Sequence, residues 1–361
     1  MQKSQKSTTT GTAGTLLQLA HTSKVLKNNP LGDPHQRTLP VYLPPGYDAH
    51  PTKHYPLIFE LAGFTGSGLG RIAWKNFEEN VPQRLDRLIN SNKMPPCIVA
   101  FPDCFTALGG NQYINSTAIG KYADYINKEL VPFVDHNLRT KSNHRHRAVV
   151  GKSSGGYGAM MFGMNYPEVW GAVGNHSGDA YFDFVYKSEW PAVITYLQNF
   201  KKTKSATPIK TIQANPGIDD GRIQNFLNHF KQANPSGMDI MTLMMLCMAA
   251  TYDPHPRSKL GFRIPFDLNT GELLEKRWQQ WLTHDPINLS KQQAKNLSKL
   301  RGLYIDCGWR DQFHIHFGTR QLSQVLKRHK VPHRYEEFEG THSGIDYRLD
   351  TSLPFLARKI R

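Results

Sequence analysis

Long apolar runs are missing from this sequence of 361 residues. No stretch reaches the roughly twenty consecutive apolar residues that a membrane-spanning helix needs. The polar N-terminus, MQKSQKSTTTGTAG, also lacks the apolar centre of a secretory signal. The sequence therefore predicts a soluble protein without a membrane span.

Cysteine is scarce as well. The chain has four cysteines, which are Cys97, Cys104, Cys247 and Cys307. They are too few and too irregularly spaced for a disulfide framework or a zinc site. We therefore expect a reducing compartment, the cytoplasm, and no metal or organic cofactor.

Acidic residues are outnumbered, with 29 Asp and Glu against 44 Lys and Arg, which gives a formal net charge of +15. A positive field attracts anions, so an anionic substrate is one expectation. The basic residues are spread along the chain without a recognition-helix, zinc-finger or RNA-binding signature. We expect no specific nucleic-acid partner, and a merely basic, soluble surface is the simpler explanation. The sequence carries no signal for an oligomeric state.

Short apolar runs that end at turn signals indicate strands. They lie at 39–43, 55–61, 97–101, 148–150, 170–173 and 303–306. The middle runs do not alternate with polar residues, which is typical of strands buried on both faces of a parallel sheet. Helix-like segments at 120–136, 154–166 and 319–329 separate them. The pattern predicts an α/β fold with a mostly parallel, doubly wound sheet and helices on both faces. Pro40 would interrupt a ladder, so we expect the first run at an edge.

The alternation of strands and helices stops between about Phe184 and Leu297. Only helix-like segments occur there, at 190–200, 222–232 and 239–250. We therefore expect one domain, residues 15–361, with a helical cap insertion at about 184–297 and a flexible tail at 1–14. The segment 238–248 is rich in methionine, which suits an adaptable apolar wall over a binding site, although an ordinary buried helix explains it too.

A nucleophile elbow is indicated at Ser153, in the sequence Gly151-Lys152-Ser153-Ser154-Gly155. An apolar strand precedes it and a helix follows, and small flanking residues allow the tight turn that exposes the serine hydroxyl. The helix N-terminus adds free N–H groups that favour developing negative charge. Ser153 is therefore the candidate nucleophile.

A serine nucleophile needs a base and an orienting acid, which follow it in the order acid, then histidine, in this kind of fold. Asp311 lies on the turn after the strand-like run 303–306, and His342 follows the run 334–338. They are our candidate acid and base. Asp306 is the rival acid but sits within the strand, and Asp103 precedes the nucleophile.

Other histidines compete with His342. His314 and His316 follow Asp311 closely, and their spacing could suggest a metal pair, but no carboxylate or cysteine cluster accompanies them. We interpret them as rim or surface residues. His176 ends another core strand and is a candidate for the wall of the cleft.

Ester hydrolysis also needs two N–H donors for the negative charge that develops on the carbonyl oxygen. The backbone N–H of Ser154 is one candidate. The second comes from the glycine-containing loop after the run 55–61, where we choose the N–H of Phe64. Glycine-rich loops also follow many strands for steric reasons alone.

These motifs together resemble the putative-esterase family of α/β-hydrolases, which includes esterase D, S-formylglutathione hydrolase, enterochelin esterase and the mycolyltransferases. The matching stretches are 41–47, the Gly63 loop, 153–159 with 166–167, 177–178, 308–311 and 340–343. The resemblance implies a triad of Ser153, Asp311 and His342 with donors at Phe64 and Ser154. The chain departs from many members at Ala62, where they have histidine, and at Lys152, where they have a neutral residue. We expect the Lys152 side chain to point away from the site.

The expected function is therefore a serine carboxylic-ester hydrolase that acts on a small-molecule ester through an acyl-enzyme. An acyltransferase or a siderophore-lactone esterase of the same fold is the alternative among enzymes. Peptidase activity is a third possibility, because the same triad cleaves amides. Outside enzymes, the alternative is a catalytically idle binding module with the hydrolase fold.

Overall fold

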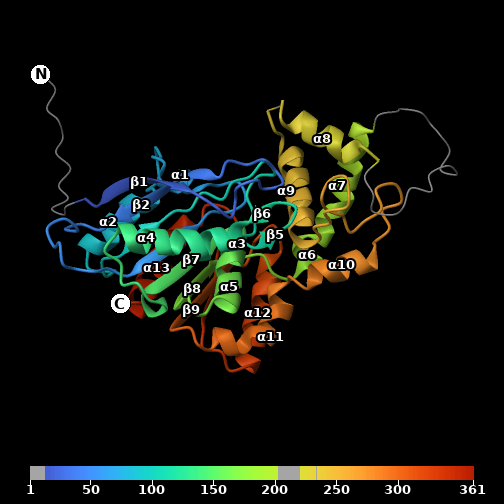
Figure 1. Ribbon diagram of the computed structural model, residues 1–361. Helices are drawn as coiled ribbons and strands as arrows, with labels where there is room; N and C mark the ends of the chain where they lie inside the picture. The colour runs from blue at the N-terminus through green and yellow to red at the C-terminus, as the bar shows by residue number, and fades with distance from the viewer. Residues whose placement is uncertain (1–12, 202–219, 233) are drawn as a thin grey trace, which may run out of the picture.

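An eight-stranded sheet forms the centre of the computed structural model, which describes residues 13–201, 220–232 and 234–361 (Figure 1). Its strands lie in the order β1-β2-β4-β3-β7-β8-β9-β10. The bounds are β1 (Thr15–Thr22), β2 (Gln36–Leu43), β3 (Leu57–Leu61), β4 (Ile98–Ala100), β7 (Arg147–Lys152), β8 (Ala172–His176), β9 (Gly302–Gly308) and β10 (Arg334–Phe338). A separate two-stranded sheet pairs β5 (Asn115–Ser116) with β6 (Gly120–Lys121).

The six strands from β4 to β10 in that order run parallel, whereas β1 and β2 are antiparallel to their neighbours. Every residue of β3, β8 and β9 is buried. Runs without polar alternation fit strands that are covered on both faces. The prediction of a mostly parallel sheet is therefore confirmed.

Two details of the sheet differ from the prediction. β1, which was not predicted, is a partly exposed strand whose alternating pattern marks it as an edge. It pairs with β2, where Pro40 lies opposite Gln18, so the run at 39–43 is not at an edge and that prediction was wrong. Pro40 faces Phe101, just beyond the end of β4, and its carbonyl accepts from the Phe101 N–H. Because β4 ends there, the ladder needs no N–H donor from Pro40.

Helices cover both faces of the sheet. One apolar core lies against α2 and α13, and a larger one lies against α5, α12 and the helical run around α4. The bounds are α1 (Gly68–Ile72), α2 (Val81–Asn90), α3 (Tyr122–Asp124), α4 (Val131–Asn137), α5 (Ser154–Asn165), α12 (Ile315–Arg328) and α13 (Leu349–Lys359). The helix expected at 120–136 is therefore interrupted: after β6 and α3 it continues as a π-helix at Tyr125–Leu130 before α4.

Only helices and loops are described between β8 and β9, and most of them gather beyond one end of the sheet, at the right in Figure 1. They are α6 (Phe182–Val185), α7 (Trp190–Leu197), α8 (Arg222–Phe230), α9 (Gly237–Tyr252), α10 (Glu275–Leu282) and α11 (Pro286–Leu297). The helix-like segments expected at 190–200, 222–232 and 239–250 correspond to α7, α8 and α9. Most of the tail expected at 1–14 lies outside the described residues.

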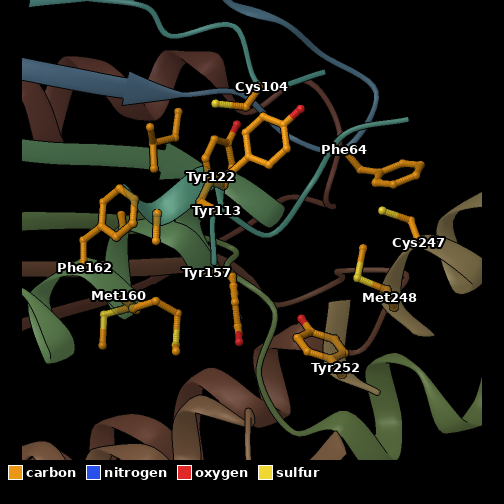
Figure 2. Close-up of a cluster of buried hydrophobic side chains, with 14 of the residues drawn as sticks. Phe64, Cys104, Tyr113, Tyr122, Tyr157, Met160, Phe162, Cys247, Met248 and Tyr252 are labelled. Atoms are coloured by element: carbon orange, nitrogen blue, oxygen red, sulfur yellow. The ribbon is translucent and has the colours of Figure 1, made fainter. Parts of the chain in front are cut away.

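The methionine-rich helix α9 joins the main core. A capping box between Ser236 and Asp239 begins it, and its buried side chains share one cluster with those of α5. Figure 2 shows Cys247 and Met248 of α9 on the same side of this cluster as Phe64. The Cys247 thiol donates to the carbonyl of Gly110, 3.2 Å away, in a loop that packs against Phe64. α9 therefore supports the loop that follows β3.

Candidate active site

The turn at Ser153 connects β7 directly to α5. Ser153 has φ 57° and ψ −125°, a conformation that is rare for a residue other than glycine. The strand and helix approach closely here: a Cβ on Gly155 would lie 2.1 Å from the Leu61 carbonyl oxygen, and one on Gly151 would lie 2.4 Å from Gly155. The Ser153 side chain forms no capping hydrogen bond with α5. This is the strained elbow that the sequence predicts.

His342 and Asp311 meet on adjacent loops. The Nδ1 atom of His342 lies 2.8 Å from Oδ2 of Asp311, whose carboxylate is fully buried. The other Asp311 oxygen, Oδ1, accepts from the Phe313 N–H at 2.9 Å. A buried carboxylate with these partners holds the imidazole in one tautomer and leaves its Nε2 free to take a proton.

The two loops hold each other in place. The N–H groups of Trp309 and Arg310, after β9, donate to the carbonyls of Phe338, the last residue of β10, and Gly340, in the loop that follows it. Gln312 adds a side-chain contact that sequence reasoning missed: its Oε1 accepts from the His342 N–H at 2.9 Å. Parallel strands β9 and β10 end at the same edge of the sheet, which is why residues 31 positions apart meet there.

Two N–H groups near Ser153 are free to bind an anion. Phe64 lies in the turn after β3, and Ser154 is the first residue of α5; in the described part of the chain neither backbone N–H donates to another group. The turn is close to the elbow, since a Cβ on Gly63 would lie 3.6 Å from the Ser153 Cβ. Both donors were predicted for an oxyanion hole.

A cavity of about 450 Å³ joins these residues. Its wall includes Ser153, Ser154, Phe64 and His342, so four of the five predicted site residues share one cavity, and Asp311 lies behind His342. This volume is within the range of about 300–1,000 Å³ that is typical of small-molecule sites. From α9, the cavity is lined by Gly237, Ile240, Met241 and Met244.

Lys152 also lines the cavity. It is the last residue of β7, beside Glu60 and Arg71, which line the same wall. Arg71 binds Glu60 through Nε, 2.8 Å from Oε1, and reaches Asp346 at 3.3 Å. Burial raises the pKa of Glu60 in spite of Arg71, and it lowers the pKa of Lys152.

A second polar group in the wall, centred on Asp179, was not predicted. Its carboxylate accepts from the Tyr186 hydroxyl at 2.7 Å and from Gln112 Nε2 at 3.0 Å. Gln112 also donates to the Ser154 hydroxyl at 2.9 Å. Burial raises the pKa of Asp179. Gln112 lies in an irregular loop, so no sequence pattern could have connected it with the elbow.

The rival acid, Asp306, belongs to a different network. It accepts from His176 Nδ1 at 2.6 Å and from Arg348 Nε at 2.8 Å, and His176 Nε2 lies 2.8 Å from the Ser352 hydroxyl. Asp306, His176 and Ser352 are all buried. His176 is not among the residues that line the cavity, so its expected place in the cleft wall is wrong.

The remaining candidates lie elsewhere. Asp103 forms an ion pair with Arg37 at 2.9 Å, and neither His314 nor His316 lines the cavity. Within the described ranges, no group of three or more His, Cys, Asp or Glu side chains is arranged to hold a metal ion. Over the same residues, no helix has the length and apolar character that crossing a membrane requires.

Comparison with known proteins gives partial sequence relatives and many solved structures with a similar fold. An endo-1,4-beta-xylanase/feruloyl esterase from Xylanibacter ruminicola is 26% identical over 209 residues, which are 53% of this chain. The chain spans only about a quarter (27%) of the length of that relative.

Solved structures match over nearly the whole chain. A ferulic acid esterase superposes with a TM-score of 0.59 and 18% identity, covering 96% of this chain and 99% of its own. An S-formylglutathione hydrolase from Agrobacterium tumefaciens has a TM-score of 0.56 and 14% identity, covering 98% of each chain. At these identities the likeness concerns the fold.

A family model described as "Putative esterase" matches residues 34–351, which include every predicted site residue. The sheet, the elbow and the family match agree. The chain therefore belongs to the putative esterase family, whose members are enzymes with the α/β-hydrolase fold that its own sheet and helices form.

Proposed function

We propose that this protein is a serine carboxylic-ester hydrolase that acts through a triad of Ser153, His342 and Asp311. The observation that carries the proposal is the 2.8 Å contact between His342 and the buried Asp311, with His342 and Ser153 lining one cavity. Membership of the esterase family supports the same reaction.

The proposed reaction has two steps. His342 Nε2 takes the proton from the Ser153 hydroxyl as its oxygen attacks the ester carbonyl, and the N–H groups of Phe64 and Ser154 bind the oxyanion. His342 then protonates the departing alcohol, which leaves an acyl group on Ser153. Water, deprotonated by His342, attacks this acyl-enzyme and releases the acid. Asp311 stabilises the imidazolium in both steps.

The oxyanion donors supply a large share of the rate. A preorganised N–H donor in a water-excluded site is worth roughly 10²-fold or more in rate. The bonds from Gln112 to Ser154 and Asp179 support this proposal because they fix the first turn of α5, where one of the donors lies.

We further propose that the helices within 184–297 act as a cap that selects the substrate. The three α9 side chains in the cavity wall, Ile240, Met241 and Met244, support this role because methionine adapts to ligands of different shape. We also propose a cytoplasmic location, with which the four free, buried cysteines agree.

Replacing the nucleophile tests the proposal. Ser153→Ala removes the attacking oxygen, so we expect turnover of short 4-nitrophenyl esters to fall at least 10³-fold. Labelling by a fluorophosphonate should fall to background. Ester hydrolysis followed at 405 nm and mass spectrometry of the labelled protein are the measurements. Undiminished turnover by the folded variant would disprove the assignment.

A matched control is Ser188→Ala. Ser188 is an exposed serine that donates to the Phe184 carbonyl and does not line the cavity. This variant should keep both turnover and labelling. Loss of both in the control as well would mean that the assay measures fold integrity and not the nucleophile.

A further inference from the structure

The cation beside the nucleophile has no partner of its own. The Lys152 side chain forms no hydrogen bond or ion pair with any other residue that the structure describes, although the residue lines the cavity. Its register partner on β8, His176, has both ring nitrogens engaged by Asp306 and Ser352. A partly buried ammonium without a hydrogen-bond partner is costly, and desolvation accordingly lowers the pKa of Lys152.

The carboxylates near Lys152 are bound by other cations. Glu60 accepts from Arg71 at 2.8 Å, and Asp346 accepts from Arg71 and from Lys75 at 3.3 Å and 3.2 Å. Asp346 is buried, which would raise its pKa, but Arg71 and Lys75 outweigh burial and lower the pKa to about 2. Lys75 also binds Glu78 at 3.0 Å, so Arg71 and Lys75 are both paired with carboxylates, whereas the Lys152 ammonium has no hydrogen-bonded carboxylate.

A second part of the cavity wall has a different character. Val185 of α6, Phe313, and Ile240, Met241 and Met244 of α9 line it with apolar surface. Ser153 and His342 line the same cavity as this apolar surface and the basic residues. An ester bound at Ser153 therefore meets both apolar and positively charged surface in one cavity.

We propose that Lys152 binds an anionic group of the substrate, so that the natural substrate is an ester with one carboxylate- or phosphate-bearing half and one apolar half that contacts α9. This inference rests on the proposed function. An anion supplies the partner that Lys152 lacks, and its attraction is stronger than in bulk water because the cavity wall lowers the local dielectric constant. Lys152 is thereby a substrate-binding residue and takes no part in proton transfer.

Two matched pairs of rigid esters test the inference. In the first pair, 4-acetoxybenzoate and its methyl ester, the negative charge is on the phenol half. In the second, the mono(4-nitrophenyl) ester of terephthalic acid and its methyl ester, the charge is on the acyl half. The rigid ring keeps the carboxylate from attacking its own ester. For each pair we take the ratio of kcat/KM for the anionic ester to that for the neutral one.

The variant Lys152→Met removes the charge and keeps most of the length. We expect it to lower this ratio at least tenfold in one of the two pairs, and Lys152→Arg to restore most of the difference. Comparing enzymes by ratio cancels the intrinsic reactivity of each ester. Lys75→Met is the control: it removes the same charge close by, but Lys75 does not line the cavity, so the ratio should change less than twofold.

Ionic strength gives a measurement that needs no variant. Raising NaCl from 20 mM to 500 mM should lower the ratio of the wild-type enzyme in the pair that depends on Lys152 and leave that of Lys152→Met constant, because salt screens the attraction. Equal ratios in wild type and Lys152→Met for both pairs would overturn the inference while neutral esters still reported the proposed hydrolase activity. If the wild-type enzyme showed no Ser153-dependent turnover of any of these esters, the proposed function itself would be overturned.

Discussion

At the residue scale, two buried carboxylates at β9 and the turn after it have different partners. Asp311 contacts His342, which lines the cavity, whereas Asp306 binds His176 and Arg348, which do not. Both were candidates for the acid. Their separate networks allow one substitution to test chemistry and the other to test stability.

We expect Asp311→Asn to lower kcat by roughly 10³–10⁴-fold, because an amide at this place favours the wrong imidazole tautomer and no longer stabilises the imidazolium. Asp306→Asn should instead lower the free energy of unfolding by about 3 kcal/mol, since it removes the buried negative charge that Arg348 binds and leaves Glu336 as the carboxylate partner of Arg348. The folded fraction should retain turnover. Steady-state kinetics and urea unfolding measure the two effects. The reverse result, inactivity only in the Asp306 variant, would exchange the two roles.

The structure brings Ser153, Phe64, Ser154 and His342 to one cavity, with Asp311 in contact with His342. This juxtaposition could be predicted because parallel strands end at one edge of the sheet, so loops far apart in sequence meet there. Gln112 and Asp179 could not, because the partners of a side chain in an irregular loop depend on tertiary packing.

At the element scale, α9 presents neighbouring methionines to different surroundings. Met244 lines the cavity, and Met245, the next residue, is fully buried in the core. Both interpretations of the methionine-rich segment, a binding wall and a buried helix, therefore describe part of the same helix.

Truncating each methionine separates these roles. Met244→Ala should enlarge the cavity and shift the preference toward esters with longer acyl chains, by several fold in the kcat/KM ratio of octanoate to acetate. Met245→Ala should leave this ratio unchanged and lower the free energy of unfolding by about 2–5 kcal/mol, because it creates a hole in a packed core. An ester series and urea unfolding are the measurements. Identical preference profiles in both variants would contradict a role of α9 in selection.

The strands show where sequence patterns stop being informative. Fully apolar runs identified the central strands, since burial on both faces leaves a strong signal. β1 was missed because an edge strand with one polar side resembles an extended loop, and Pro40 was misplaced because the effect of a missing N–H depends on where the neighbouring strand ends. Which strands pair with each other depends on tertiary structure, and the sequence of a single strand does not contain this information.

At the scale of the whole molecule, acid should destabilise the fold through His284. Burial lowers the pKa of this ring to about 4, from an ordinary 6.5. Between these values the unfolded chain binds a proton that the folded chain does not, so stability falls as the pH decreases. From pH 7 to pH 5 we expect a loss of about 1–2 kcal/mol from this residue.

His284→Gln isolates this contribution. The difference between the unfolding free energies of wild type and variant should change by that amount from pH 7 to pH 5. It should be constant between pH 7.5 and pH 8.5, where the ring is neutral in both states. Urea unfolding at each pH measures it. Parallel curves over the whole range would show that the ring is accessible to protons in the folded protein.

The buried network of Asp306, His176 and Ser352 is an internal control for reagents that modify serine. It has the same three side-chain types as the proposed triad, and its serine is hydrogen-bonded to its histidine, but Ser352 is completely inaccessible. Access to the cavity, and not composition or hydrogen bonding, should therefore decide which serine reacts. In a labelled sample, the peptide that contains Ser352 should remain unmodified for as long as the protein stays folded, and its modification would report unfolding.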